Sequence, residues 1–306
     1  MLSDAEKFKK DNIMEGIGFL RCIYDAVRLV DPVTKKVYEM DESLRECKSS
    51  CYEFWNAGQV CKNCVSMRAI KENKTFIKIE YNGEKVYMVT VVPVQVGNRV
   101  FVAELLKEAS DSNLVEEFLG KGQSEIYEML ERKNMLLVMD ELTKIFNRRY
   151  INERLPCEII QASLIDEEIS IILADIDKFK SINDTYGHIA GDKVLQVFAG
   201  VLEGCIRKGL DWAARYGGEE FIVFLKGAGY EEAHEAAERM RKATEGIVVD
   251  YEGRTIRFTS SFGVCTLNKS LGMEKLIAAA DRNLYTAKNT GRNKVISSEY
   301  EGGDSD

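Results

Sequence analysis

Residues 169–177 read Ile-Ser-Ile-Ile-Leu-Ala-Asp-Ile-Asp, an apolar run that ends in acidic residues. A continuous apolar run of this length is typical of a strand that is buried on both faces. Such a strand would deliver Asp175 and Asp177 at its end, beside backbone carbonyl groups. Carboxylate and carbonyl oxygens suit a hard cation such as Mg²⁺, although acids that only solvate a strand end are the other interpretation.

A second stretch, residues 215–221, reads Arg-Tyr-Gly-Gly-Glu-Glu-Phe and lies between two apolar segments. Gly217 and Gly218 permit positive φ in a hairpin turn and let a ligand approach the backbone closely. Alone, this pattern with Glu219 and Glu220 is a common surface turn. Together with Asp175, it predicts three carboxylates within reach of one metal-bound triphosphate.

Length and composition set the frame around these stretches. The 306 residues are 45% hydrophobic and 30% charged, which fits a globular chain of about two domains. No run approaches about 18 uncharged apolar residues, so no membrane span is predicted. The amino terminus lacks the apolar region of a secretory signal, and we therefore expect a cytoplasmic location.

The charge distribution bears on the partners. The formal net charge is −8, and the acidic excess lies after residue 110. This disfavours a nucleic-acid partner. It also means that an anionic substrate in the carboxy-terminal part must be held by a few placed cations or by metal ions, because the overall field repels it.

The organisation along the chain is expected to be α+β. Residues 1–110 show strand patterns at 22–30, 37–40, 76–81, 85–94 and 99–106, with a helical, cysteine-bearing segment between the second and the third. This order resembles a PAS-type sensor domain, an antiparallel sheet with helices. Residues 111–140 predict a helical connector, which either pairs with its twin in a dimer or is a plain surface helix. Residues 141–298 alternate helix and strand, and residues 299–306 predict a disordered tail.

Half of the eight cysteines cluster in the first domain: Cys47, Cys51, Cys61 and Cys64. Without an export signal, such a cluster favours metal or redox chemistry over a disulfide scaffold. Four thiolates suit tetrahedral Zn²⁺ or an iron–sulfur cluster. A reversible disulfide sensor and unliganded core thiols are the alternatives. The Cys-Tyr pair at 51–52 followed by Cys-x-x-Cys at 61–64 resembles a cysteine-bearing variant of PAS domains.

The carboxy-terminal half resembles the GGDEF family of diguanylate cyclases over roughly residues 138–296. Its motifs occur in the family's order: Asp-Glu-Leu-Thr at 140–143, the long segment 175–192, the signature at 217–221, Ser-Phe-Gly at 261–263 and the closing segment 281–295. The resemblance implies an α/β, nucleotidyl-cyclase-like fold. It also implies that two GTP molecules, one on each subunit of a homodimer, condense to cyclic di-GMP and two pyrophosphates. A catalytically silent module that binds GTP or cyclic di-GMP is the alternative.

The same resemblance implies roles for individual residues. Asp175, the carbonyl of Ile176 and Glu219 would hold two Mg²⁺ per active site, and Glu220 would orient a metal, accept a proton or only lie beside the ligands. Asn183 and Asp192 would read guanine. The remaining substrate contacts would come from Gly217, Gly218, Lys288 and Arg292, with Lys180 neutralising the charge that develops as the bond breaks.

Two departures from the family pattern stand out. Lys144 occupies a turn position where the family commonly has Gly. The inhibitory Arg-x-x-Asp site of the family reads Lys-Gly-Leu-Asp at 208–211. Lys208 keeps the charge but lacks the planar fork of Arg, so the site at Lys208 and Asp211 is degenerate and we expect weak or absent feedback by the cyclic product.

Overall fold

The computed structural model describes residues 19–40, 44–56, 58, 60–96, 99–109, 121–267 and 272–300. The chain divides into two compact units, residues 1–137 and 138–306. In the described part of the chain, no helix has both the length and the apolar character that crossing a membrane requires.

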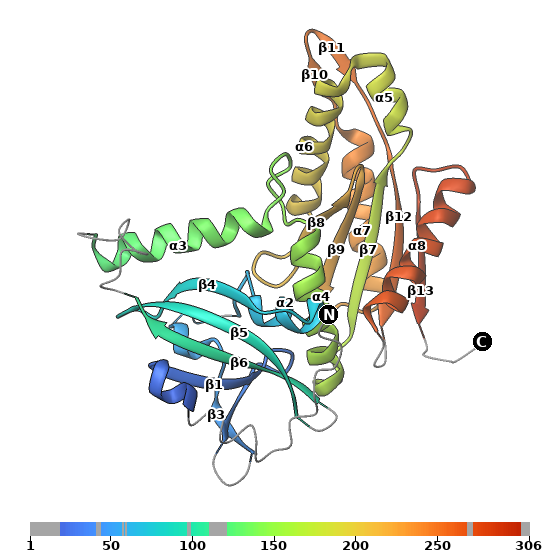
Figure 1. Ribbon diagram of the computed structural model, residues 1–306. Coiled ribbons are helices and arrows are strands. Elements are labelled where there is room, and N and C mark those ends of the chain that lie inside the picture. The colour runs from blue at the N-terminus through green and yellow to red at the C-terminus, as the bar shows by residue number, and fades with distance from the viewer. Residues whose placement is uncertain are drawn as a thin grey trace, which may run out of the picture. The chain divides into compact units, whose positions relative to one another are not determined.

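The first unit is built on a six-stranded antiparallel sheet with the strand order β3-β2-β1-β6-β5-β4 (Figure 1). This order is compatible with a PAS-like domain. Between β3 and β4 the chain forms the short helix η1 (Glu53–Trp55) and α2 (Val65–Glu72). The strands are β1 (Ala26–Asp31), β2 (Lys36–Met40), β3 (Leu44–Ser50), β4 (Phe76–Tyr81), β5 (Val86–Val96) and β6 (Arg99–Glu108).

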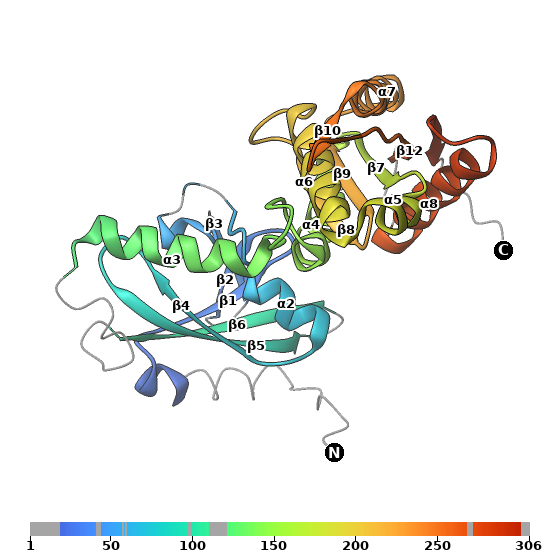
Figure 2. The ribbon, with the colours of Figure 1, turned by 90° about the horizontal axis from the view of Figure 1, so that it is seen from above.

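Helix α3 (Gln123–Val138) is the described part of the predicted connector. It lies along the sheet over β4 (Figure 2), where Leu130 packs with Tyr81 and Val86. Helix α3 therefore has an apolar contact with the six-stranded sheet of the first unit.

The sequence-based strand assignment was wrong at two places. The chain is still helical at Cys22, and the first strand begins only at Ala26. Cys47 lies on the strand β3 and not in a helical segment, because β3 pairs antiparallel with β2. An edge strand of this kind depends on its ladder partner, which local sequence does not reveal. Residues 111–120 of the predicted connector lie outside the described residues.

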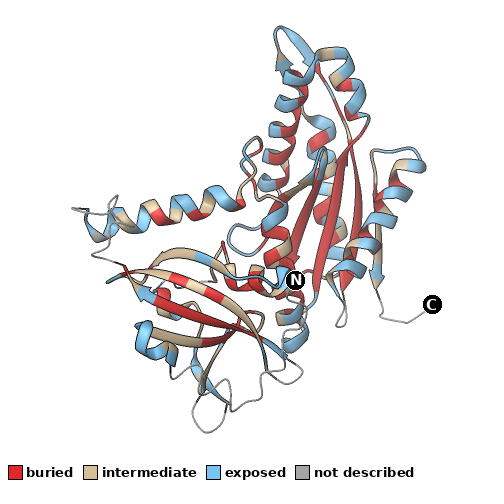
Figure 3. Ribbon diagram, viewed as in Figure 1, coloured by how far each residue is buried: buried red, intermediate tan, exposed pale blue. Residues whose placement is uncertain are grey.

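The second unit has a five-stranded sheet in the order β13-β12-β7-β9-β8. All eight residues of the central β7 are buried, as predicted for a strand covered on both faces (Figure 3). The strands are β7 (Ile169–Ile176), β8 (Trp212–Gly217), β9 (Glu220–Lys226), β12 (Ser260–Leu267) and β13 (Val295–Tyr300), with a small ribbon of β10 (Val249–Tyr251) and β11 (Arg254–Ile256).

Helices cover both faces of this sheet. The contacts pair α6 with α7 and α4 with α8. β13 continues to Tyr300, so the first two residues of the predicted tail, 299 and 300, lie in a strand. The helices are α4 (Arg148–Ile165), α5 (Phe179–Tyr186), α6 (His188–Gly204), α7 (Tyr230–Gly246) and α8 (Met273–Asn289).

Candidate active site

Strand register brings the acidic residues of the second unit to one edge of the sheet. β7 and β9 pair antiparallel, and Asp175 lies directly opposite Glu220. Glu219 precedes Glu220 in the turn that joins β8 to β9, where Gly218 adopts a left-handed φ of 55°. The ladder with β9 ends at Asp175, one residue before Ile176. The two stretches that carried the sequence argument therefore meet in space.

Asp175 is the most strongly perturbed acid of this group. It is buried, and burial raises its pKa to about 6, while the hydrogen bond and charge of Lys288 oppose the rise and the charges of Glu219 and Glu220 add to it. A buried carboxylate among like charges favours a neighbouring cation or a proton. In this structure Lys288 supplies the cation, with 2.7 Å between Nζ and Oδ2.

Lys288 reaches Asp175 because α8 lies very close to the sheet. A Cβ atom on Gly263 of β12 would stand 2.2 Å from the backbone oxygen of Ala280 and 2.3 Å from the backbone nitrogen of Leu284. Only glycine permits this approach, since the obstructing atoms belong to the helix backbone. Gly263 is thus a positioning residue in the Ser-Phe-Gly motif.

Asp177 does not join the acidic group of Asp175, Glu219 and Glu220. It is buried, and its carboxylate accepts hydrogen bonds from Thr259 Oγ1 (2.7 Å), Ser261 Oγ (2.7 Å) and the backbone N–H of Asn293 (3.0 Å). The last bond ties down the loop after α8, where Arg292 adopts a left-handed φ of 64°. Sequence reasoning treated Asp177 only as a second acid at a strand end, whereas the structure uses it to shape the loop that carries Arg292.

Asn183 on α5 lies against the start of α6. A Cβ on Gly191 would stand 1.9 Å from Asn183 Oδ1, so the side chain of Asn183 fills the space that the missing side chain leaves. Asp192 follows directly and is exposed. The structure therefore brings the two predicted guanine-reading residues to neighbouring places on α5 and α6.

The remaining predicted residues lie at the surface of this unit. Lys180, Glu220 and Arg292 are exposed, while Glu219 and Lys288 are partly buried. Among the residues that the structure describes, no three His, Cys, Asp or Glu side chains are grouped so that they could hold a metal ion. The predicted Mg²⁺ ligands are two side chains and one backbone carbonyl, so they do not require such a group.

The predicted inhibitory site is closed by a neighbour. The guanidinium of Arg207 donates two hydrogen bonds to the carboxylate of Asp211, from Nη2 at 2.7 Å and from Nε at 2.8 Å. Asp211 is buried. A guanine base would have to displace Arg207 to reach this carboxylate. Lys208, which occupies the family's Arg position, is exposed.

The four clustered cysteines, Cys47, Cys51, Cys61 and Cys64, do not form one ligand set. Cys51, Cys61 and Cys64 line one cavity, whereas Cys47 on β3 lines a different hollow with Arg21 and Tyr38. Together with the lack of a grouped metal-binding set among the described residues, this does not fit the predicted four-thiolate Zn²⁺ or iron–sulfur site. Local spacing suggested four ligands, but the pairing of β3 with β2 separates the first from the rest.

Comparison with known proteins gives consistent matches. A family model described as "Diguanylate cyclase, GGDEF domain" matches residues 137–294. Diguanylate cyclase A of Treponema denticola is 47% identical over 134 residues, which cover 44% of this chain and 36% of that protein. Diguanylate cyclase DosC of Escherichia coli is 37% identical over 172 residues, covering 56% of this chain and 37% of that protein.

A solved structure matches as well. The GGDEF domain of DgcB from Caulobacter crescentus, crystallised in complex with c-di-GMP, has a TM-score of 0.51 and 28% identity and covers 53% of this chain and 93% of that one. The aligned parts are well under half of the length of the curated relatives described above.

Proposed function

The chain belongs to the family of diguanylate cyclases with a GGDEF domain, and from this premise we propose that it condenses two GTP molecules into cyclic di-GMP and two pyrophosphates. The observation that carries the proposal is the meeting of Asp175 with the Glu219–Glu220 turn at one sheet edge, beside Lys288. This edge holds both the acids that a divalent cation needs and a cation for phosphate. GTP is the expected substrate because Asn183 and Asp192 lie on adjoining helices.

The acidic group fits Mg²⁺. Its donors are oxygens, which Mg²⁺ prefers, and the charges of Glu219 and Glu220 act on the buried Asp175. Asp175, Glu219 and the carbonyl of Ile176 would hold the two ions. When bound, Mg²⁺ neutralises phosphate charge and lowers the pKa of the attacking 3′-hydroxyl.

The other side chains act on the nucleotide. Lys288 and Arg292 bind phosphate oxygens through charge-assisted hydrogen bonds, and Gly217 and Gly218 leave room for the phosphates beside the turn. Lys180 neutralises the charge that develops as pyrophosphate leaves. For Glu220, exposed and opposite Asp175, we propose that it accepts the proton of the attacking hydroxyl.

Guanine recognition follows from hydrogen-bond chemistry. The carboxylate of Asp192 accepts from the N1 and N2 donors of guanine, and the amide of Asn183 complements them. Adenine lacks these donors, so it would leave a polar group unpaired.

Catalysis requires a homodimer, because each catalytic unit binds one GTP and two must face one another. The first unit is then a regulatory sensor, which alters the relative placement of the two half-sites, and small misplacement of reacting atoms costs orders of magnitude in rate. No nucleic-acid partner is proposed, and the cytoplasmic location stays a prediction.

A nucleotide assay tests this function. The purified chain is incubated with GTP and Mg²⁺, and the nucleotides are separated by chromatography. Cyclic di-GMP and pyrophosphate should form, and Glu219→Ala should abolish them. Glu235→Ala, at an exposed position on α7, is the matched control and should retain activity. Bound GTP without product in the wild type would favour the silent-module alternative.

A further inference from the structure

The first unit contains three thiols around one small space. Cys51, Cys61 and Cys64 are free and partly exposed, and they line a cavity of about 30 Å³. This volume holds about one water-sized group. Burial raises the pKa of both the Cys51 and the Cys61 thiols, to about 12 for Cys61. The charge of Cys64 adds to the rise in pKa at both of them. Cys64 is therefore near both of the other thiols.

Between Cys61 and Cys64, Asn63 holds the connector helix. It is 2% exposed, and its Nδ2 donates to Oδ1 of Asn134 on α3 at 3.1 Å. Two further hydrogen bonds fix it: Arg68 Nη2 donates to its Oδ1 at 2.7 Å and Lys78 Nζ donates to its backbone oxygen at 3.0 Å. A short loop bounded by two thiols thus carries a buried polar contact to α3.

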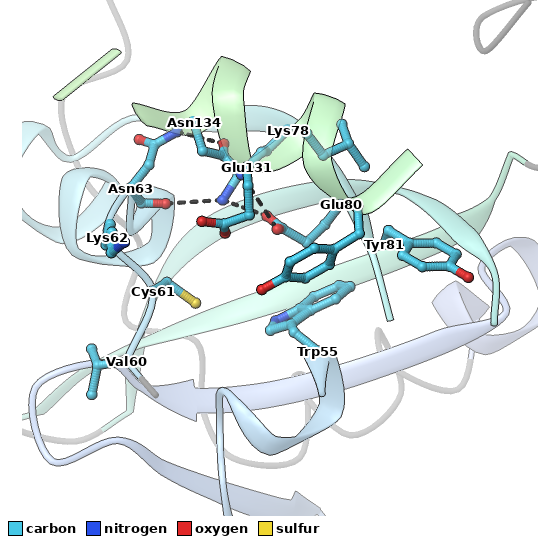
Figure 4. A pocket seen from close by; sticks show the side chains of 12 residues that line it. Trp55, Val60, Cys61, Lys62, Asn63, Lys78, Glu80, Tyr81, Glu131 and Asn134 are labelled. Carbon is cyan, nitrogen blue, oxygen red and sulfur yellow. Dashed lines mark hydrogen bonds and ion pairs between the residues drawn. The ribbon is translucent and has the colours of Figure 1, made fainter. Parts of the chain in front are cut away.

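Cys61 and Asn63 line both the thiol cavity and a second hollow beside the Asn63–Asn134 contact. Cys61 also borders a second hollow, lined by Asn63 and by Glu131 and Asn134 of α3. Figure 4 shows the Cys61 sulfur pointing into this hollow, with Asn63 and Asn134 turned toward one another. Asn134 further donates to Glu80 Oε1 at 3.5 Å, and Glu80 pairs with Lys78. A change at Cys61 would therefore act on groups that hold α3.

We propose that Cys61 and Cys64 form a reversible disulfide, and that closing this bond draws Asn63 away from Asn134 and loosens α3 from the sensor sheet. A disulfide fixes the two Cβ atoms at about 3.5–4.5 Å, so the two residues between the thiols must follow it. Asn63 cannot follow while its present hydrogen bonds remain. The effect on cyclase activity rests on the proposed function, but the switch itself does not.

The redox step is thiol–disulfide exchange with a low-molecular-weight disulfide. The Cys64 thiolate attacks one sulfur of that disulfide and expels a small thiolate, giving a mixed disulfide. The Cys61 thiolate then attacks the Cys64 sulfur and expels the second. The two protein thiols lose two protons and two electrons, and the small disulfide becomes two thiols.

The test uses the full chain in glutathione buffers, either fully reduced or oxidised. Peptide mapping by mass spectrometry should find Cys61 linked to Cys64 only after oxidation. Hydrogen exchange should then be about tenfold faster at residues 123–138, as expected from the loss of buried hydrogen bonds. Cys64→Ser should remove both changes, and Cys47→Ser, in the other hollow, should retain both.

A second variant separates the contact from the chemistry. Asn134→Ala should loosen α3 already in the reduced protein, with an unchanged β-sheet exchange pattern as evidence that the unit is folded. The proposal is overturned if oxidised wild type links Cys64 to Cys51 instead, if the link forms without faster exchange in α3, or if the reduced protein carries one tightly bound Zn²⁺ per chain on these thiols. If the mapping and exchange results hold but no cyclic product forms in any state, the switch stands and the proposed activity fails.

Discussion

Replacing Gly191 with Ala should separate guanine recognition from stability. Gly191 lies in the first turn of α6, and the added Cβ would stand 1.9 Å from Asn183 Oδ1, 3.0 Å from Asn183 Cγ and 3.2 Å from Phe179 Cζ. Real Cβ atoms do not approach this closely, so Asn183 must turn away. The obstructing atoms belong to the end of a flexible side chain, so the fold can accommodate the new methyl group. The proposed contact of Asn183 with the nucleotide would be lost.

The expected effects on stability and on catalysis differ in size. Within a helix, Gly→Ala favours the folded state by about 1 kcal/mol, and the displacement of one side chain offsets part of this. The free energy of unfolding should therefore change by no more than about 1 kcal/mol in either direction. Loss of the hydrogen bonds proposed between Asn183 and guanine should cost about 1–3 kcal/mol, or roughly a 5- to 150-fold fall in kcat/KM for GTP.

Gly200→Ala is the matched control, because Gly200 lies in the same helix and a Cβ there meets nothing within 4 Å. It should gain the same helix propensity without any change in kcat/KM. Urea unfolding and initial rates over a range of GTP concentrations give both quantities. If Gly191→Ala binds and turns over GTP as the wild type does, Asn183 does not read guanine in this conformation and the reasoning is refuted.

Three further outcomes are expected. Glu219→Ala should lower kcat at least about 100-fold, in line with the loss of a group that stabilises developing charge, while its melting temperature stays near that of the wild type. Because burial raises the pKa of Asp175 to about 6, the metal-binding carboxylate form is lost as the pH falls through 6. Activity should fall with it, and rates at two Mg²⁺ concentrations should show a lower midpoint at the higher concentration, since proton and metal compete. Added cyclic di-GMP should inhibit the wild type weakly, whereas Lys208→Arg combined with Arg207→Ala, which removes the side-chain hydrogen bonds of Arg207 to Asp211, should be inhibited at a lower product concentration in initial-rate assays.

The parts of the fold that could be predicted from the sequence are those that depend on neighbouring residues along the chain. The apolar run of β7 required burial on both faces, and Gly217 and Gly218 required a turn. Lys144 shows the limit of such reasoning. The family's Gly position there is kept in a left-handed conformation, with φ of 61°, even though Lys is strained in it. The hydrogen bond from Lys144 N to Asp140 O (2.9 Å) maintains the turn.

What the sequence could not predict depends on long-range register. The separation of Cys47 from the other cysteines follows from β3 joining β2, and the grip of Arg207 on Asp211 follows from how one turn closes. The role of Asp177 also depends on a distant segment, because one of its partners is the backbone N–H of Asn293. Any residue except proline offers this donor, so the sequence around Asn293 does not reveal the contact.

The residues that we propose for the chemistry are placed by residues for which no chemical role is proposed. Asp175 is set by strand register, Lys288 by the close approach that Gly263 permits, and Arg292 by the loop that Asp177 binds. Each placement rests on backbone geometry, which keeps the backbone of Lys288 and Arg292 close to the acidic end of β7. Lys288 forms an ion pair with Asp175, with 2.7 Å between Nζ and Oδ2. Phosphate oxygens then compete for the same ammonium group, and we infer that substrate binding transfers Lys288 from Asp175 to phosphate and leaves the carboxylate available to a cation that arrives with the nucleotide.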